Sequence, residues 1–464
     1  MLSSANLDRQ KLESEQDFVK ATQLLGDLFG LPTLQAVFEE EGCRPNQIYT
    51  QAPTLLLLIL QRLGGGLTLD GVVNELLKHH RDILPAHRRV QRNTLSRNSS
   101  AYSKARQSLP LEKVNAFSNA ICDHLAAGSA AAWERRRVMI LDGTTITLPP
   151  TPELRAAFPP ASNQHGESVW PVAMLMVASE MTTGCVMVPE IGAMYGENNT
   201  SEVAQAQRII DRLPEDALIL GDSGFGIFQV AFHCADRDRE FLFRLTAQRF
   251  KALKKQADVV EKLRGSATWH FHWKPSAKDR KNNPDLPKEA EVEVFVHEVE
   301  LEGEKNLYLV SNVAADAESL GELYLRRYDV EFDIRDVKVT MDTENIRARK
   351  LDTVLKELMG SVIAYNLVIQ FRRLAAESVS IKPRRLSFSG VWITFQVDLL
   401  RSGAQSFEQW QEEFAEALRH AASRKLPNRS RVRSSPRLAH PRRQKSTKFQ
   451  KQQRNKTRKT TMQI

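Results

Sequence analysis

Two aspartates in this 464-residue chain stand where a buried charge needs an explanation. Asp142 lies within the apolar run Val138–Thr144, and Asp222 stands at the end of Ala217–Leu220, a wholly apolar run typical of a strand buried on both faces. Because a carboxylate is costly to bury without a cation or hydrogen-bond donors, the two together indicate a metal site. Taken singly, either aspartate could instead form a turn with its neighbouring glycine.

A third carboxylate, Glu331, belongs to a polar stripe on a predicted helix. Tyr324, Arg327, Glu331 and Lys338 are offset by 0, 3, 7 and 14 positions, which confines them to an arc of roughly 60° on an α-helix. All four side chains can therefore face one ligand. The alternative is a solvated face with an i,i+4 ion pair between Arg327 and Glu331. That alternative does not account for Tyr324 or Lys338.

The helix that carries the polar stripe should also have an apolar side that packs on a sheet and leaves the polar stripe at its margin. A neighbouring apolar stripe fits this role, and it consists of Leu323, Val330, Ile334 and Val337. Short β-rich runs predict an antiparallel meander of three strands at Val138–Leu148, Trp170–Ser179 and Cys185–Val188. We expect a helix at Ser201–Leu213, the buried strand Ala217–Leu220 and a strand at Glu240–Thr246.

The remaining segments differ in character from this α/β core. The first 128 residues have helical periodicity, and their basic segment Gln91–Arg106 could touch DNA backbone or simply connect helices. Strand-like runs at Thr268–Trp273, Glu291–Val299 and Asn306–Val310 predict an inserted β-rich subdomain. Within it, Trp269 and Trp273 either line one strand face or stack on an unpaired base.

Composition separates a basic tail from an acidic body. Arg424–Ile464 holds 15 Lys and Arg and no Asp or Glu, whereas the preceding residues hold 50 basic and 56 acidic side chains. The tail is low in complexity, and we expect it to be disordered and to bind a polyanion, or to have no specific partner. The longest apolar run, Leu55–Leu60, is far short of the roughly 20 residues of a membrane span. With no secretory signal and four widely spaced cysteines, we expect a soluble cytoplasmic protein without membrane association, disulfides or a zinc site.

The stripe also matches a known signature. Tyr, two residues, Arg, three residues, Glu, six residues, Lys is the signature of the insertion sequence four family of bacterial DDE transposases, and Tyr324, Arg327, Glu331 and Lys338 fit it at every position. The segments Leu141–Thr144 and Leu220–Phe225 resemble the first and second aspartate motifs of that family, in the same order. Ser223 departs from the basic residue that many members carry there, which leaves the metal ligand unaffected.

The resemblance covers roughly Arg137–Ala376 and implies a fold, a site and partners. It implies an α/β ribonuclease H-like mixed sheet with flanking helices. The metal ligands and catalytic residues would be Asp142, Asp222 and Glu331, holding two Mg²⁺ ions, with Mn²⁺ as a substitute. The DNA-binding residues would be Tyr324, Arg327 and Lys338, and a homodimer would assemble on double-stranded DNA carrying terminal inverted repeats and on target DNA. Two alternatives are a metal-dependent nuclease that does not join strands and a catalytically silent DNA-binding derivative.

These observations predict a division of the chain. The expected parts are a helical N-terminal DNA-binding domain (1–130), the first part of the catalytic core (131–246), the β-rich insertion (247–316), the second part of the core with the glutamate helix (317–380), a C-terminal helical region (381–423) and the basic tail (424–464).

Overall fold

One mixed sheet runs through the part of the chain that carries the candidate site. The computed structural model describes residues 20–29, 47–128, 131–163, 166–255, 258–263, 266–301 and 305–427. Within these residues the sheet has ten strands in the order β2-β3-β1-β5-β6-β10-β9-β8-β7, and β4 also pairs with β3. The strands are β1 (Arg137–Thr147), β2 (Pro160–Asn163), β3 (Gly166–Glu180), β4 (Glu190–Ala193), β5 (Ala217–Gly221), β6 (Glu240–Arg244), β7 (Asp258–Leu263), β8 (Ser266–Trp273), β9 (Val292–Leu301) and β10 (Lys305–Ser311).

The predicted mixed α/β sheet is confirmed, and its centre is parallel. β1 and β6 both run parallel to β5, whereas β3 pairs antiparallel with β1 on one side and β4 antiparallel with β3 beyond it. The third strand of the meander was predicted too early, at Cys185–Val188. There Val186 makes only an isolated bridge to Ser179, and the paired strand β4 begins at Glu190. Cys185, Val186, Met187 and Val188 are buried although they precede the paired strand, so apolar composition did not mark where strand pairing begins.

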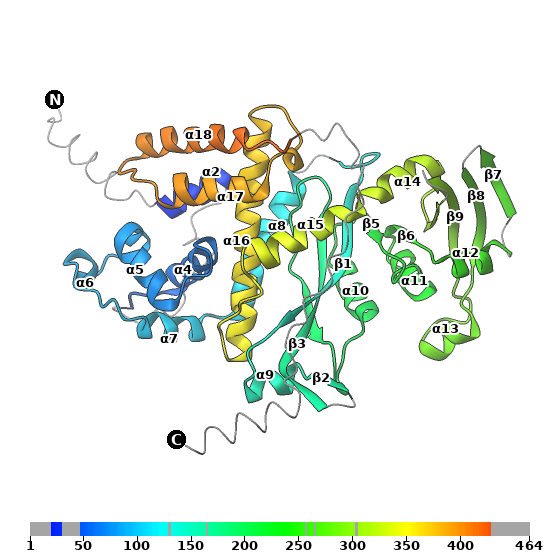
Figure 1. Cartoon of the computed structure of the whole chain (residues 1–464), viewed down its shortest axis with the longest axis horizontal. Helices are drawn as coiled ribbons and strands as arrows, with labels where there is room; N and C mark the ends of the chain where they lie inside the picture. The colour runs from blue at the N-terminus through cyan, green and yellow to red at the C-terminus, as the bar shows by residue number, and fades with distance from the viewer. Residues whose placement is uncertain are drawn as a thin grey trace, which may run out of the picture. The chain divides into compact units, whose positions relative to one another are not determined.

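The strands of the predicted insertion continue this same sheet. β10 pairs antiparallel with β6, with Leu309 opposite Arg244, and β9, β8 and β7 follow outward in antiparallel pairs. The expected strands are therefore present, and they extend the sheet instead of forming a separate one (Figure 1). The division of the chain at residues 247 and 316 stays a prediction.

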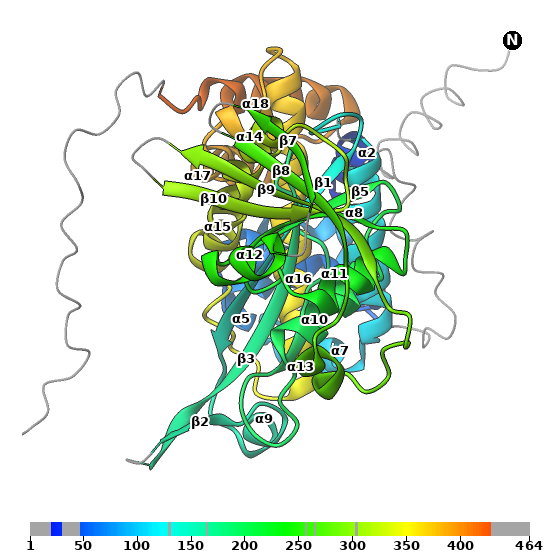
Figure 2. The same cartoon turned by 90° about the vertical axis from the view of Figure 1, so that its right-hand side faces the viewer.

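Helices cover both faces of the sheet, as Figure 2 shows. The alternation along β1 determines which residues meet which helices: Met139 and Leu141 pack with α10 (Glu202–Ile210) and α11 (Phe228–Ala235), whereas Val138 and Ile140 pack with α14 (Ala317–Leu325) and α15 (Asp329–Arg335). Two shorter helices are α12 (Ala247–Lys254), where Phe250 packs on Trp269 of β8, and α13 (Ala277–Asn282), which is followed by Asn283 bonded to Gln229 of α11.

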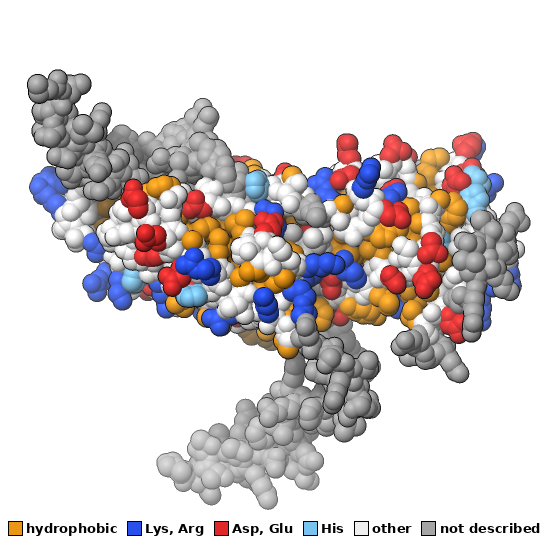
Figure 3. Space-filling view, turned by 90° about the horizontal axis from the view of Figure 1, so that it is seen from above, with side chains coloured by type: hydrophobic (Ala, Val, Ile, Leu, Met, Phe, Trp, Pro, Cys, Tyr) orange, Lys and Arg blue, Asp and Glu red, His pale blue; other side chains and the backbone are white. Residues whose placement is uncertain are grey.

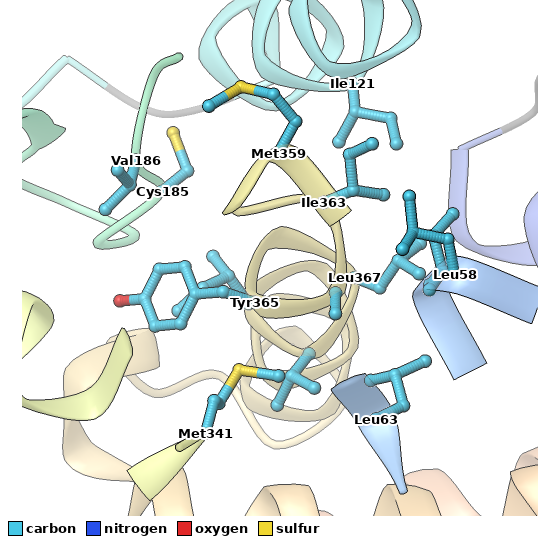
Figure 4. Packing of buried hydrophobic residues seen from close by; sticks show 14 of the residues in the cluster. Leu58, Leu63, Ile121, Cys185, Val186, Met341, Met359, Ile363, Tyr365 and Leu367 are labelled. Carbon is cyan, nitrogen blue, oxygen red and sulfur yellow. The ribbon is translucent and has the colours of Figure 1, made fainter. Parts of the chain in front are cut away.

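A long apolar helix, α16 (Leu351–Glu377), organises the second core. It packs against α4 (Gln51–Leu63) and α8 (Leu111–Ala127) with side chains such as Met359, Ile363 and Leu367 (Figure 4). α16 is long and apolar enough to cross a membrane, but 94% of its most apolar window is buried inside the molecule. Its hydrophobicity is therefore explained by its place in the core.

Further helices flank α16 on both sides. The N-terminal set is α2 (Lys20–Phe29), α5 (Leu69–His79), α6 (Arg88–Gln91) and α7 (Ser100–Ser108), with the 3₁₀ turn η1 (Arg81–Ile83). The C-terminal set is η4 (Pro383–Arg385), α17 (Phe388–Thr394), the π-helical turn η5 (Phe395–Leu400) and α18 (Phe407–Ser423). The short helix α9 (Pro152–Ala157) precedes β2. Residues 30–46, which belong to the N-terminal region with helical periodicity, and residues 428–464 of the basic tail lie outside the described residues.

Three of the four cysteines, Cys122, Cys185 and Cys234, are buried free thiols, as expected, and Cys43 lies outside the described residues.

Candidate active site

The register between β1 and β5 brings the two candidate aspartates to the same level. Ile140 on β1 lies opposite Leu220 on β5, and two residues further along each strand stand Asp142 and Asp222. Since neighbouring strands lie about 4.8 Å apart, the two aspartates are adjacent. Asp222 accepts hydrogen bonds from the Gly224 amide at 2.8 Å, and Asp142 from the Gly143 amide at 3.0 Å.

Helix α15 presents Glu331 to this pair. Val330 is fully buried against the face of β1 that carries Val138 and Ile140. Because side chains alternate between the two faces of a strand, Asp142 belongs to this same face. Glu331 receives a hydrogen bond and ion pair from Arg327 at 3.0 Å. Its side chain is 54% exposed, whereas that of Arg327 is 10% exposed. Glu331 therefore stands at the solvent margin of the sheet and Arg327 beneath it.

The predicted regular helix is interrupted on either side of Glu331. The 3₁₀ turn η2 (Arg326–Tyr328) precedes α15, and the π-helical turn η3 (Asp336–Thr340) follows it. A spacing of 100° per residue therefore does not hold from Tyr324 to Lys338. The expectation of one uniform stripe on a straight helix was wrong in detail, because tighter and wider turns adjust the path.

The charges of the three carboxylates act on one another. Burial raises the pKa of Asp142 above its ordinary value, and the neighbouring Asp222 and Glu331 carboxylates raise it further, against the opposing effects of Arg327 and the Gly143 amide. Excess negative charge is thus concentrated here, with Arg327 as the cation that acts most strongly on Asp142. A site of this kind favours a bound cation.

A fourth carboxylate, Glu202, approaches from the opposite face of β1. It stands in the first turn of α10, whose N-terminus is capped by Ser201. A Cβ on Gly143 would collide with the Glu202 carboxylate, so the missing side chain provides the space that this carboxylate fills. Burial raises the pKa of Glu202, with Asp222 and Asp142 adding to the effect.

Lys338 and Tyr324 flank the carboxylates in different ways. The Lys338 ammonium donates to the Thr144 hydroxyl at 3.2 Å and to the Thr145 carbonyl at 2.9 Å, and it pairs with Glu344 at 3.0 Å. Tyr324 is 3% exposed, and its buried hydroxyl has no hydrogen-bond partner within the described part of the chain. Burial raises the pKa of Tyr324. The hydroxyl is thus a neutral, unsatisfied donor beside the site.

The donor set suits a hard divalent cation. Asp142, Asp222 and Glu331 supply carboxylate oxygens, which Mg²⁺ prefers. Throughout the described ranges, no three His, Cys, Asp or Glu side chains are gathered closely enough to enclose an ion. Glu331 instead turns to Arg327. Asp142 and Asp222 are adjacent, and Glu331 would have to leave Arg327 to join them around a cation.

The structure decides between alternatives that the sequence left open at two places. Trp269 and Trp273 are 5% and 8% exposed and belong to the core between the sheet and α11, which agrees with the alternative that they line one strand face. Arg106, at the end of the basic segment Gln91–Arg106, is buried and pairs with Glu357 at 3.4 Å beside Arg62, so this residue neither faces DNA nor is solvated. The two tryptophans and Arg106 are therefore all part of the protein interior.

Sequence reasoning also missed functional candidates. Glu202 was inside a predicted helix but was not singled out, although the Ser201 cap and a first-turn acidic residue mark that position. Asp333, two residues from Glu331, is 1% exposed and pairs with Arg384 at 2.8 Å. No local signal links Asp333 to Arg384, because the contact spans 51 residues.

Comparison with known proteins identifies the family of the chain. The family model of the transposase DDE domain matches residues 133–367, which include all the residues of the signature. Over 266 residues the chain is 27% identical to the transposase InsG for insertion sequence element IS4 of Escherichia coli strain K12, and the match covers 55% of this chain and 57% of that relative. A solved structure of the piggyBac transposase synaptic complex with hairpin DNA aligns at 12% identity over 90% of this chain and 83% of its own, with a TM-score of 0.36. Because the family model covers half of the chain, the protein belongs to the transposase DDE domain family.

Proposed function

We propose that this chain is a transposase that cuts DNA at the ends of a mobile element and joins those ends to target DNA. The observation that carries the proposal is that Asp222, next to the end of β5, and Glu331, on α15, both act electrostatically on the half-buried Asp142 of β1, which gives this region a surplus of negative charge. Membership in the transposase DDE domain family supports the same reading.

The strand order supports a ribonuclease H-like core. Numbered along the chain, the strands β1, β3, β4, β5 and β6 give the spatial order third, second, first, fourth, fifth, with the second strand antiparallel and the first, fourth and fifth parallel. The candidate aspartates stand on the two central parallel strands. Ligand sites in α/β sheets concentrate at the carboxyl ends of such strands.

The carboxylates would hold two Mg²⁺ ions, or Mn²⁺ in their place, with Asp142 shared between the ions and Asp222 and Glu331 each holding one. Bound in this way, the ions would stabilise the attacking and leaving oxygens of an in-line displacement at a phosphodiester. Glu331 would exchange its contact with Arg327 for the cation, which frees the Arg327 guanidinium for a phosphate oxygen.

Three other side chains would grip DNA beside the cut. Lys338 is anchored by the backbone and hydroxyl of β1 two to three residues beyond Asp142, which puts its charge next to the carboxylates. With Arg327, it would bind phosphates near the cleaved end. The unpartnered Tyr324 hydroxyl would donate to a nucleic-acid oxygen. The same site would use water for the first cut and the freed 3′ hydroxyl for joining.

The N-terminal helices offer a separate basic surface for double-stranded DNA. Between Lys78 and Lys104 there are seven Lys and Arg, all exposed, and a single acidic residue, Asp82. Part of this region forms a polar cavity of about 540 Å³ lined by Asn74, Lys78, Arg81, Asn93 and Arg97, among others. Lys and Arg side chains gather at the end of the molecule where α5 to α7 lie (Figure 3). This surface would bind the phosphate backbone of the terminal repeats.

The basic tail would add non-specific affinity. Deleting residues 428–464 removes 13 of its Lys and Arg and spares Arg424 and Lys425, which pair with Ser387 and Leu386. We expect weaker DNA binding and a shallower salt dependence, since fewer counterions are released. An unchanged slope in a binding titration from low to high salt would exclude the tail. We further propose a homodimer on DNA and a cytoplasmic, nucleoid-associated location.

An assay with Mg²⁺ and DNA bearing the element's inverted repeats tests the proposal. Wild type should nick the ends and produce joined products, and Asp142→Asn, Asp222→Asn and Glu331→Gln should do neither. Asp216→Asn is the matched control, because Asp216 lies at the opposite end of the same strand pair, in an exposed ion pair with Arg137. Nicks without joining would favour a nuclease. Repeat binding without nicking would favour a silent DNA-binding protein.

A further inference from the structure

The buried side of helix α15 carries a second carboxylate with a complete set of partners. Asp333 is 1% exposed, and both of its oxygens accept hydrogen bonds from Arg384, each at 2.8 Å. The Ser179 hydroxyl of β3 donates to the same carboxylate. Because residues two apart on a helix point about 200° away from each other, Asp333 faces into the protein while Glu331 faces the site.

Arg384 is itself fixed to the framework. Its Nε donates to the Met181 carbonyl at 2.7 Å, and it lies 3.7 Å from Asp329 at the start of α15. Burial works to lower the pKa of Arg384, but Asp333 holds it above its ordinary value, so the guanidinium stays charged. Gly184, with φ of +84°, leaves room for this pair, since a Cβ there would lie 2.8 Å from an Asp333 oxygen. Both partners of the ion pair are thus held by further contacts.

The position of Ser179 relates this contact to the catalytic strand. In the β1–β3 register, Ser179 lies opposite Ile140, and Val177 lies opposite Asp142. The hydrogen bond from Ser179 therefore ties α15 to the sheet one side-chain step away from Asp142. Helical hydrogen bonding alone cannot fix this alignment, because η2 and η3 interrupt the regular helix on both sides of α15.

We propose that Ser179, Asp333 and Arg384 form a clamp that sets the rotation and the register of α15 and so places Glu331 against Asp142. The clamp residues are positioning residues. They touch neither DNA nor cation, and they act through Glu331. This inference rests on the proposed function, since it assigns the clamp the task of preparing the cation site.

A purely stabilising ion pair is the competing explanation. Losing one partner of a buried ion pair destabilises a protein wherever the pair lies, because the other charge is left buried without compensation. A drop in stability alone therefore does not distinguish the two explanations. The distinguishing quantity is cation affinity. If the clamp positions Glu331, its loss weakens binding even in protein that remains folded, and residues that orient metal ligands typically change affinity by about 10- to 100-fold.

The test measures Mn²⁺ binding to the full-length, metal-free protein by calorimetric titration, well below each variant's unfolding temperature. Asp333→Asn should raise the Kd for Mn²⁺ about tenfold. Ser179→Ala, which removes one hydrogen bond and is expected to fold, should raise it severalfold. In the double variant Asp333→Asn/Arg384→Gln, removal of the uncompensated charge should restore part of the melting temperature while the Kd stays high.

Glu357→Gln is the matched control. Glu357 is a buried carboxylate of α16, and it pairs with Arg62 of α4 and Arg106 of α7. It also accepts hydrogen bonds from the amides of Arg347 and Ala348, which lie outside α15. Its melting temperature should fall while the Kd for Mn²⁺ stays at the wild-type value. A wild-type Kd in both Asp333→Asn and Ser179→Ala would overturn the clamp. If wild type itself neither binds Mn²⁺ nor cuts repeat DNA, the proposed function fails, and that outcome differs visibly from failure of the clamp alone.

Discussion

Two of the three carboxylates of helix α15, Glu331 and Asp333, lie two residues apart in opposite electrostatic surroundings. Glu331 pairs with Arg327, and it acts together with burial and Asp222 to raise the pKa of Asp142. On the other side, Asp333 has both oxygens satisfied by Arg384 and a further bond from Ser179.

The contrast separates two uses of a buried charge. A carboxylate whose partners neutralise it contributes to the structure, and its removal leaves a cation uncompensated. Carboxylates that repel one another cost stability in the folded protein and persist because a ligand supplies the missing charge. Replacing Asp142 with a neutral residue should therefore increase the free energy of unfolding, whereas replacing Asp333 should decrease it.

The largest expected effects come from neutralising Asp142, which other carboxylates repel, and Asp333, which Arg384 neutralises. Asp142→Asn should reduce DNA cleavage by about 10³-fold or more, since it removes a proposed shared ligand. In metal-free buffer the same change should increase the free energy of unfolding by about 0.5–1 kcal/mol, because burial disfavours the charged form of Asp142 and Asp222 and Glu331 repel it. Asp333→Asn should decrease it by about 3 kcal/mol. Urea unfolding with a chelator present measures both, and destabilisation by Asp142→Asn would erase the contrast.

Gly143→Ala tests whether Glu202 belongs to the repelling group. The added Cβ would push the Glu202 carboxylate away from Asp142 and Asp222. We expect about a tenfold loss of cleavage, a barrier change of about 1.4 kcal/mol, with little change in melting temperature. Gly403→Ala is the control, because a Cβ there meets nothing within 4 Å. Full activity of Gly143→Ala would show that the position of Glu202 is unimportant.

Gly184→Ala tests the contact between Asp333 and Arg384, because Gly184 lies next to this pair and has a left-handed backbone conformation. The left-handed conformation costs a non-glycine residue about 1–2 kcal/mol, and the Cβ would also press on Asp333. Gly65→Ala matches the first effect alone, since Gly65 has φ of +76° and open space around it. We expect Gly184→Ala to be about 1 kcal/mol more destabilising than Gly65→Ala in urea unfolding. Equal losses would mean that the clamp adapts easily.

Sequence patterns predicted the mutually repelling carboxylates of the candidate site. They did not predict the buried ion pair of Asp333 and Arg384, and the reason is physical. Asp142 and Asp222 were recognisable because each interrupts an apolar strand, and parallel pairing then makes them neighbours. Glu331 was recognisable from spacing along one helix. Asp333 depends on Arg384, 51 residues away, and on a turn at Gly184. Nothing local records such a pairing.

The fold shows the same limit. Apolar alternation located most strands to within two residues, including β1 and β5. It could not show that β10 pairs with β6, and so the outer strands were expected in a separate subdomain. It also could not anticipate the 3₁₀ and π turns around α15, since these depend on tertiary anchoring rather than on side-chain periodicity.

The smallest predicted effect is a difference in pH dependence between wild type and Asp142→Asn without metal. Burial first, and then the other carboxylates, raise the pKa of Asp142 in the folded protein above its unfolded value of about 3.9. Between these two pKa values the folded state binds more protons than the unfolded state, so stability falls as the pH rises. The stabilising effect of Asp142→Asn should thus be absent below pH 4 and should grow until the pH passes the raised pKa.

Melting temperatures of wild type and Asp142→Asn, measured from pH 4 to 7 with a chelator present, give this difference directly. Saturating Mn²⁺ should reverse its sign at pH 7, because only wild type retains the shared ligand, and a constant difference at all pH values would mean that Asp142 carries no excess charge.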